Sequence, residues 1–390
     1  MSEFKASGFR DEFGSGGPDL VGITTMTSPY YFVPPSGSTA ERPSSPAPGM
    51  LRFNTDIGRL EVWRNDHWAT ILGESPNLGD NNNTNSSGGT GTRGVFMGGL
   101  APAETDVIDY ITISTMGDAQ DFGNLTQAKR LGGACSSATR GLTLGGFVSP
   151  SIKSEIDFIT FSSTGNAADF GDITSVKRSN GGLANSIRGL STGGVTPTNS
   201  NAIDAVVIAA TGTAQDFGDL VTSMGQPYGT ASPVRGVIAG GETPARVNTI
   251  QYVTISTQGN AHDFGDLTFG RSGNLGFGNA TRGIFAGGEI PASPTFVNSI
   301  EFVTMASTGN SQDFGDLDNA NGLRLGGSAS SPTRGIYASG VNDTPTSSTV
   351  YAQIHMVTIQ TTGNAIDFGD VTAARWQMFN GTVSNGHGGL

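Results

Sequence analysis

The motif Asp-Phe-Gly is the first feature of the sequence that could carry chemistry, because protein kinases use its aspartate to bind magnesium. The chain has neither the glycine-rich phosphate loop nor the His-Arg-Asp segment that kinase chemistry also needs. The motif occurs six times, and this repetition indicates architecture rather than one site. We therefore expect its Phe side chains to pack between repeats and its Asp side chains to cap turns. The six phenylalanines are Phe122, Phe170, Phe217, Phe264, Phe314 and Phe368.

An arginine recurs with a similar spacing, followed by Gly, three mostly apolar residues and a Gly-Gly pair, or Ser-Gly in the last copy. Six arginines at one position of a ring could line a channel mouth and bind an anionic ligand. We favour the simpler interpretation, in which each arginine joins neighbouring repeats through carboxylates and carbonyl groups. These residues are Arg93, Arg140, Arg188, Arg235, Arg282 and Arg334.

Histidine and cysteine add no candidates for catalysis. His67, His262, His355 and His387 have no metal-ligand spacing, and we expect solvated or incidental positions for His262 and His355. Cys135 is the only cysteine and cannot form an internal disulfide, so we interpret it as a small core residue. The sequence predicts no catalytic residue, no metal and no cofactor, and we expect that the protein is not an enzyme.

The net charge of −12 bears on the possible partners. An acidic surface repels phosphate backbones, so we expect no nucleic-acid partner. The sequence has no run of about 18 apolar residues, so we expect no membrane insertion. Residues 1–20 lack the apolar core of a signal peptide. Together with the single cysteine, this predicts a protein of a reducing compartment that a standard signal does not export.

Two repeated markers predict the fold. Successive arginines are 47, 48, 47, 47 and 52 residues apart, and the Asp-Phe-Gly motif follows them in every copy. Such a period is typical of an array of similar structural units. Each copy should contain four short strands, represented by residues 94–99, residues 108–114, the Asp-Phe-Gly segment and residues 130–137. The last stretch is rich in Gly, Ala and Ser, which suits an innermost strand where several sheets converge.

A sheet of one copy cannot bury its own faces, so the copies should stack around a ring. Residues 92–390 are therefore predicted to form an all-β, six-bladed β-propeller. The first copy lacks an innermost strand of its own, whereas residues 374–385 have that pattern and no blade follows them. We expect this C-terminal strand to complete the first blade and to close the ring, which leaves no open sheet edge.

The repeat is similar to the kelch repeat, which combines an arginine, a small-residue strand, an apolar strand ending in Gly-Gly and an aromatic residue near the end of the blade. This resemblance covers residues 92–390 and implies a kelch-like propeller. Kelch repeats usually end in Trp, but every copy here has Phe, and Met224 stands near the place of the leading arginine in the fourth copy. Membership in the intracellular kelch adaptors does not follow. The residue clusters of the copper radical oxidases and sialidases, which also use propellers, are absent.

The first ninety residues are predicted to form three parts. Residues 1–49 form an extended attachment arm, residues 50–72 a small three-stranded β-meander and residues 73–91 a flexible linker. The meander is too small to be stable alone and should pack on a neighbour or oligomerise. The aromatic residues of the arm are anchors if the arm docks on a partner, and ordinary loop packing if it does not. The candidate anchoring residues are Tyr30, Tyr31, Phe32, Arg52, Phe53, Trp63 and Trp68.

The meander runs Gly-Met-Leu-Arg-Phe-Asn-Thr-Asp, then Leu-Glu-Val-Trp, then a strand with a second Trp, and it resembles a short module of structural proteins of tailed bacteriophages. The arm and the Gly- and Thr-rich propeller are similar to virion proteins of phages that infect marine cyanobacteria. The resemblance implies a virion protein of the tail, a fibre, the neck or the head, which is assembled in the host cytoplasm. Its N-terminal region would contact other virion proteins, and fibre proteins are often trimers, so a homo-oligomer is a further expectation.

The loops between the predicted strands differ in length and sequence among the copies. Variable loops on a rigid frame are where binding usually resides, so we expect contact with a host-surface glycan or protein there. The alternatives are a capsid or neck decoration protein that binds no host, and a cellular kelch-type interaction module or lectin. The loops concerned are residues 100–105, 147–155, 242–248, 289–298 and 341–350.

Overall fold

The computed structural model describes residues 34–64, 66–70, 92–291, 295–318, 323–344, 347–381 and 383–390. These residues form β-strands and a single short 3-10 helix, so the predicted all-β class is confirmed. The chain divides into two compact units, residues 1–75 and residues 76–390, which are described separately below. In the described ranges, no helix is long and apolar enough to cross a membrane.

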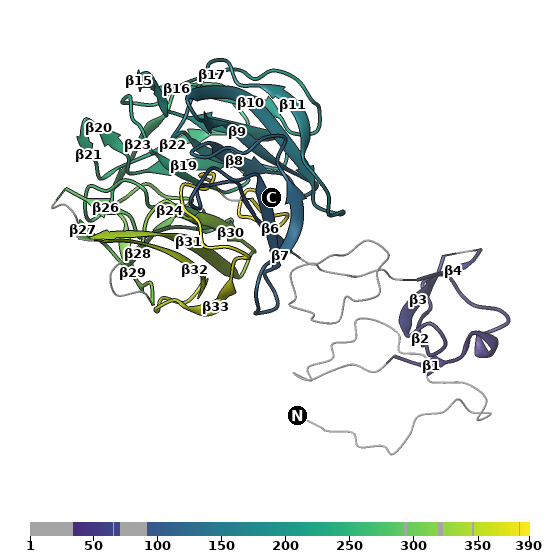
Figure 1. The fold of residues 1–390 in the computed structure, drawn as a ribbon. Helices are drawn as coiled ribbons and strands as arrows, with labels where there is room; N and C mark the ends of the chain where they lie inside the picture. The colour runs from purple at the N-terminus through teal and green to yellow at the C-terminus, as the bar shows by residue number, and fades with distance from the viewer. Residues whose placement is uncertain are drawn as a thin grey trace. The chain divides into compact units, whose positions relative to one another are not determined.

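The described residues of the first unit form a four-stranded sheet with the order β1-β2-β3-β4 (Figure 1). Its strands are β1 (Ser36–Gly37), β2 (Leu51–Asn54), β3 (Arg59–Trp63) and β4 (Trp68–Thr70). The last three form the predicted antiparallel meander. Strand β1 is an addition to the prediction, since it belongs to the stretch that we expected to be an extended arm. It runs parallel to β2, with the Phe53 amide donating to the Pro35 carbonyl at 2.7 Å.

The described residues of the second unit form six antiparallel sheets of three or four strands, numbered here in chain order. Sheet 1 is β5-β6-β7, sheet 2 is β8-β9-β10-β11, sheet 3 is β12-β13-β16-β17, sheet 4 is β18-β19-β22-β23, sheet 5 is β24-β25-β28-β29 and sheet 6 is β30-β31-β32-β33. Sheets 2 to 6 each have four strands, as predicted. Short two-stranded ribbons extend sheets 3, 4 and 5: β14 (Val195–Thr196) with β15 (Thr198–Asn199), β20 (Glu242–Thr243) with β21 (Ala245–Arg246), and β26 (Glu289–Ile290) with β27 (Thr295–Phe296).

The first strand of each four-stranded sheet lies in the predicted small-residue stretch, and every residue of these strands is buried. They are β8 (Gly133–Ser136), β12 (Gly181–Ala184), β18 (Tyr228–Ala231), β24 (Leu275–Gly278) and β30 (Gly327–Ser330). Sheet 1 lacks the first strand, so its three strands are counted as second, third and fourth. Each second strand begins at one of the six repeated arginines. They are β5 (Arg93–Met97), β9 (Arg140–Val148), β13 (Arg188–Thr192), β19 (Arg235–Ala239), β25 (Arg282–Ala286) and β31 (Arg334–Thr344).

The third strands carry the β-branched and aromatic segments. They are β6 (Val107–Thr112), β10 (Ser151–Thr160), β16 (Ala202–Val207), β22 (Thr249–Thr254), β28 (Ser299–Thr304) and β32 (Ser347–Thr358). Each fourth strand contains an Asp-Phe-Gly motif. They are β7 (Gln120–Asn124), β11 (Ala168–Asp172), β17 (Gln215–Asp219), β23 (His262–Asp266), β29 (Gln312–Asp316) and β33 (Ile366–Asp370). The register of the third and fourth strands shifts beside the motif glycine, which in β7 has a φ of 148° that favours glycine.

The small first strands contact one another in chain order, and β30 of sheet 6 contacts β5 of sheet 1. The apolar core continues across that last contact, because Phe96 and Ile111 of sheet 1 belong to one buried cluster with Ile336 and Phe368 of sheet 6. Small residues make this approach possible: a Cβ added to Gly276 would lie 2.7 Å from the Gly229 carbonyl oxygen of the neighbouring first strand.

The described C-terminal residues reach the first sheet, but they pair there through isolated bridges, Gly94 with Ser384 and Leu100 with Trp376, and form no regular strand. The Val95 amide donates to the Val383 carbonyl at 2.9 Å, and Gly94 pairs with Ser384. The chain then continues among the first strands instead of along β5, and Figure 1 shows its end (C) beside the strands of several sheets. A Cβ at Gly388 would lie 2.5 Å from the Ala231 carbonyl oxygen of sheet 4, which is why glycine is required in this crowded place.

Candidate functional site: the polar cluster of residues 38–61

The sheet of the first unit has two faces of opposite character. Strand pairing places Arg52 opposite Glu61 on one face, and both side chains are buried, with exposed fractions of 6% and 0%. Asn54 is buried on the same face. A small sheet usually buries its apolar side, so a covered face made of charged and amide groups is unusual. These polar groups must therefore be satisfied by hydrogen bonds.

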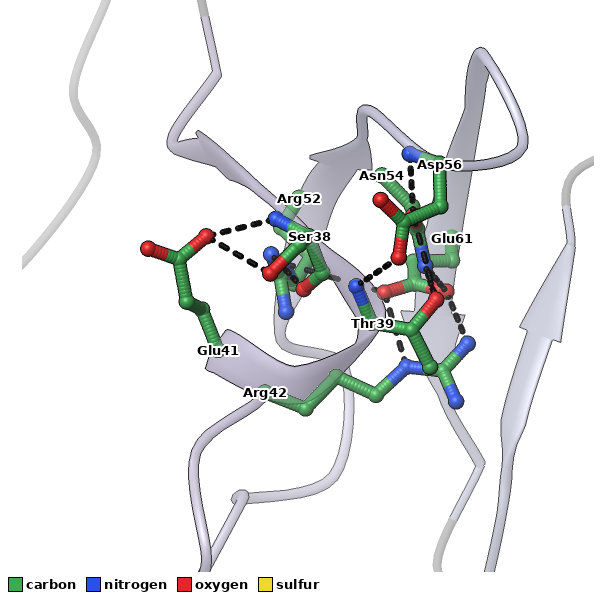
Figure 2. A network of polar contacts seen from close by, with 8 residues as sticks. All are labelled: Ser38, Thr39, Glu41, Arg42, Arg52, Asn54, Asp56 and Glu61. Carbon is green, nitrogen blue, oxygen red and sulfur yellow. Dashed lines mark hydrogen bonds and ion pairs between the residues drawn. The ribbon is translucent and has the colours of Figure 1, made fainter.

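Residues 38–42 cover this polar face and supply its partners (Figure 2). The short 3-10 helix η1 (Thr39–Glu41) is held at its start by Glu41, whose carboxylate accepts hydrogen bonds from the Ser38 amide at 2.7 Å and the Ser38 hydroxyl at 2.9 Å. The Thr39 amide donates to Asp56 Oδ2 at 2.8 Å. The segment that the sequence assigned to an extended arm is thus bound to the meander at several points.

Glu61 is the centre of the cluster. Arg42 binds its carboxylate with two hydrogen bonds, Nε to Oε1 at 3.1 Å and Nη2 to Oε2 at 2.5 Å, and Asn54 Nδ2 donates to Oε2 at 3.1 Å. Arg52 Nε lies 3.7 Å from Oε1. The hydrogen bonds from Arg42 lower the pKa of Glu61 against the opposing effect of burial, and those same bonds raise the pKa of Arg42. Because both oxygens are already engaged, the carboxylate acts as a clamp for residues 38–42.

The opposite face of the sheet carries apolar side chains that the unit leaves partly uncovered. Phe53, Leu60 and Val62 lie on it and are partly exposed, and Leu51 is 39% exposed. In the following turn, Ile57 is 46% exposed. Covering these side chains with another surface would remove apolar area from water. The apolar face is therefore the part of this unit that fits a contact with another protein surface.

The structure brings together only some of the predicted anchoring residues. Arg52 lies on the polar face with its guanidinium 6.0 Å from the ring centre of Trp68, and the ring centres of Trp63 and Trp68 are 5.6 Å apart. Phe53 lies on the other face. Tyr30, Tyr31 and Phe32 lie outside the described residues. Sequence reasoning missed Arg42 and Glu61, although the alternation of Arg-Phe-Asn and Leu-Glu-Val would have indicated a polar face opposite an apolar one.

The six repeated arginines of the second unit join each sheet to the next one. Each guanidinium donates from Nη1 to main-chain carbonyl oxygens that follow the third strand of the neighbouring sheet. The pairs are Arg93 with Phe161 (2.6 Å), Arg140 with Ile208 (3.2 Å), Arg188 with Ile255 (3.2 Å), Arg235 with Met305 (3.1 Å), Arg282 with Ile359 (3.0 Å) and Arg334 with Ile113 (2.9 Å). The partners in these contacts are carbonyl groups, whereas the simpler interpretation expected carboxylates as well, and none of these contacts is an anion site.

The Asp-Phe-Gly motifs form a second set of links between sheets. Their phenylalanines are buried, with exposed fractions of 2–3%. Main-chain groups of the motif and of the residue after it bind the turn of the next sheet: the Phe122 carbonyl accepts from the Gly165 amide at 2.7 Å, and the Asn124 amide donates to Asn166 Oδ1 at 3.1 Å. The Gly117 amide of sheet 1 donates to the Phe368 carbonyl of sheet 6 at 2.9 Å, so the same link joins the last sheet to the first.

Buried ion pairs form a third repeated feature, which sequence reasoning did not find. A cation in the segment before the first strand of a sheet binds an acid on the third strand. Four such pairs occur among the described residues: Lys129 with Asp157 (3.0 Å), Lys177 with Asp204 (2.6 Å), Arg271 with Glu301 (2.8 Å) and Arg375 with Asp109 (2.8 Å). Burial lowers the pKa of Lys129, and the nearby Asp157 carboxylate opposes that shift.

The remaining two copies replace both members of the pair. Sheet 4 has Met224 in the cation's place and Gln251 in the acid's place, and Gln251 Nε2 lies 3.7 Å from the Met224 sulfur. Sheet 6 has Leu323 and His355 at these positions. An unpaired buried charge is costly, so the loss of one partner requires the neutral replacement of the other. The departure of Met224 from the repeat pattern is explained by this paired exchange.

Two histidines occupy buried positions, which corrects the expectation for His355. That side chain is 1% exposed, and its Nδ1 lies 2.6 Å from Asp318 Oδ1. Burial lowers the pKa of His355 and Asp318 opposes this. His387 is buried among the first strands with Nε2 2.7 Å from the Ser136 carbonyl oxygen, and burial lowers its pKa to about 4. Cys135 is a buried core residue, and burial raises its thiol pKa to about 12.

Within the described ranges, no three His, Cys, Asp or Glu side chains gather where they could hold a metal ion. The protein-family models include none that matches this chain, and the curated proteins include no match either.

Proposed function

We propose that the six sheets are the blades of a kelch-like β-propeller whose ring is closed by the C-terminal residues. Three observations support this architecture. The arginine links and the Asp-Phe-Gly links run from each sheet to the next and from sheet 6 back to sheet 1. Val383 and Ser384 lie beside β5, where the first strand of sheet 1 is missing. Arg375, in the segment before them, binds Asp109 of sheet 1 in the way that Lys129 binds Asp157 of sheet 2.

We further propose that the chain is a structural protein of a tailed-bacteriophage particle. The N-terminal unit attaches to other virion proteins, and the propeller is displayed on the particle. The observation that carries this proposal is the division of the N-terminal sheet into a covered polar face and a partly exposed apolar face. The polar cluster holds residues 38–42 in place, which leaves the apolar face for a partner. Copies of the same unit, as in a trimer, are one partner that this face fits.

The outer role of the propeller is proposed to be binding of a host-surface glycan or protein. The six sheets repeat closely, whereas the ribbons β14–β15, β20–β21 and β26–β27 between second and third strands differ in sequence. Differences confined to the connections of a rigid scaffold are typical of a binding surface.

Immunogold labelling of purified phage particles with antibody against residues 92–390 tests the virion role. Label at the tail tip or fibres supports a host-binding appendage. Label on the neck or capsid supports a decoration protein without host contact. Particles that carry no label, and in which mass spectrometry finds no such protein, overturn the virion proposal.

The attachment face can be tested separately by substitution. Phe53→Asp and Val62→Asp place charges on the apolar face without touching the Glu61 cluster, and we expect both to prevent incorporation into particles. Arg64→Glu is the matched control, since it changes an exposed charge beside the same sheet. Normal incorporation of both aspartate variants would show that attachment does not use this face.

A further inference from the structure

One aromatic position in the propeller repeat is empty in sheet 3. The third strands carry an aromatic residue after the acidic position in four sheets, namely Tyr110, Phe158, Tyr252 and Phe302. Sheet 6 has Met356 there. Sheet 3 has Ala205, the smallest side chain at this position in the six copies.

The aromatic ring has the same surroundings in each of the four sheets. The repeated arginine lies over it, with 4.7, 4.8, 4.8 and 4.6 Å between the guanidinium carbon and the ring centre. The phenylalanine of the Asp-Phe-Gly motif meets it edge to face, with ring centres 5.8–6.0 Å apart. Both contacts favour an aromatic ring over an aliphatic side chain. The negative face of the ring attracts the guanidinium group, and two aromatic rings attract each other when the positive edge of one meets the face of the other.

Sheet 3 keeps these surroundings without the ring. Arg188 donates to the Ile255 and Ser256 carbonyls at 3.2 and 3.0 Å, as its counterparts do, and Phe217 is buried with an exposed fraction of 2%. In the described part of the chain, Arg188 lies over no ring. Sheets 1 and 3 both have a surface pocket beside this position, and in sheet 1 Tyr110 forms part of its wall. In sheet 3 the pocket has a volume of about 230 Å³ and reaches Arg188 and Phe217, as well as Ala205 and Gln215.

Sheet 1 shows which ring fits this space. There the Tyr110 hydroxyl donates to Gln120 Oε1 at 2.7 Å, and the two residues are directly opposite in the strand pairing. In sheet 3, Gln215 occupies the place of Gln120 and is directly opposite Ala205. The pocket therefore offers a cation for the ring face, a phenylalanine edge and an amide oxygen for a hydroxyl group (β16 and β17 in Figure 1).

We propose that this pocket binds a para-hydroxyphenyl group, supplied by a tyrosine side chain of a partner protein or by a free phenol. The ligand ring takes the position that Tyr110 occupies in sheet 1, with its hydroxyl on Gln215 and its face toward Arg188. Val207 also lines the pocket and is 51% exposed, so the atoms beside the ring meet an apolar rim.

Amide-detected NMR of the full-length protein tests the proposal, with p-cresol as the probe and toluene as the matched compound without the hydroxyl. We expect saturable shifts at Gln215 and its neighbours with p-cresol, and binding of toluene that is about fivefold weaker because one hydrogen bond is lost. Ala205→Tyr fills the pocket with the chain's own ring and should abolish the shifts. Gln215→Leu should remove the preference for p-cresol over toluene.

Tyr110→Ala provides the converse variant, because it should open a second p-cresol site in sheet 1. N-acetyl-tyrosinamide separates the two sources: its binding at the same residues indicates a tyrosine side chain, and binding of p-cresol alone indicates a free phenol. Shifts that persist in a folded Ala205→Tyr protein, or no shifts up to the solubility of p-cresol, overturn the proposal.

Discussion

Arg334 Nη1 donates a hydrogen bond to the carbonyl oxygen of Ile113 at 2.9 Å, although 221 residues separate the two in the sequence. The same arginine also donates to the Ser114 carbonyl at 2.8 Å. The contact repeats the link that every other sheet makes to its successor, and it joins the last copy of the repeat to the first. A link between the two ends of the array opposes the separation of sheet 6 from sheet 1.

Replacing Arg334 by Met should therefore lower the free energy of unfolding by about 1.5 kcal/mol, because two carbonyls lose a charged donor. Urea unfolding followed by circular dichroism measures the effect. Arg178→Met is the control. Among the described residues Arg178 forms no ion pair, and its guanidinium carbon lies 5.8 Å from the centre of the Phe147 ring. Equal midpoints for the two variants would contradict a stabilising role of the link.

The buried pair of Lys177 and Asp204 gives a second prediction. Lys177→Met alone leaves a buried carboxylate without its cation, which should cost about 3–5 kcal/mol. The double change Lys177→Met with Asp204→Gln copies the Met224 and Gln251 arrangement of sheet 4, and we expect it to recover most of that loss. Thermal unfolding of the single and double variants measures the recovery.

Lys153→Met is the control for this pair, because the Lys153 and Glu155 side chains are 28% and 38% exposed and 3.6 Å apart. An exposed pair of this kind contributes at most about 1 kcal/mol. If the double variant is as unstable as Lys177→Met, the paired replacement of cation and acid does not explain how sheet 4 tolerates Met224.

His387 should make stability depend on pH. Its pKa in the folded protein is about 4, below the usual 6.5, because burial disfavours the charged form. The unfolded chain therefore takes up a proton first as the pH falls from 6.5. The free energy of unfolding therefore does not depend on this group above pH 6.5, and it falls progressively between pH 6.5 and pH 4, by about 3 kcal/mol in total.

The variant His387→Gln keeps a donor for the Ser136 carbonyl but does not titrate, so its stability should fall less steeply between pH 6.5 and 4. Urea midpoints at several pH values measure the slope. His262→Gln changes an exposed histidine and should leave the slope unchanged. Parallel slopes in His387→Gln and the unaltered protein would contradict the buried position of His387.

In the N-terminal unit, Glu61→Gln should release residues 38–42 from the sheet, since the neutral amide loses the two-bond pairing with Arg42. The pKa of Glu61 is lowered on folding, so its contribution is present above its unfolded value of 4.5 and is lost as the pH falls through the folded pKa. Fluorescence of Trp63 and Trp68 in a Trp376→Phe background reports the change. Glu41→Gln, in an exposed carboxylate that binds Ser38, should alter the fluorescence much less.

The periodic features of the fold could be predicted from the sequence because they depend on local demands that recur in every copy. Each second strand begins at an arginine, each fourth strand needs a glycine in the left-handed region after Phe, and each first strand includes at least one glycine or alanine, such as Gly133 and Ala134 of β8. These requirements act within a few residues, so they leave a pattern of period 47 to 52 in the chain. The alternation in residues 51–63 likewise predicted the strands of the meander.

The side-chain contacts that form the polar cluster of the first unit and the buried ion pairs of the second unit could be found only in the tertiary structure. Nothing in the local sequence states that Lys177 binds Asp204, that His387 lies among the first strands, or that Arg42 closes over Glu61. These contacts form because folding removes water from groups that lie far apart in the chain, and a buried charge is stable only beside its partner. The sequence does show that the third copy has Ala205 where four other copies have an aromatic residue. Only the structure shows that Arg188 and Phe217 keep their places around the missing ring, because other contacts of the sheet already hold them.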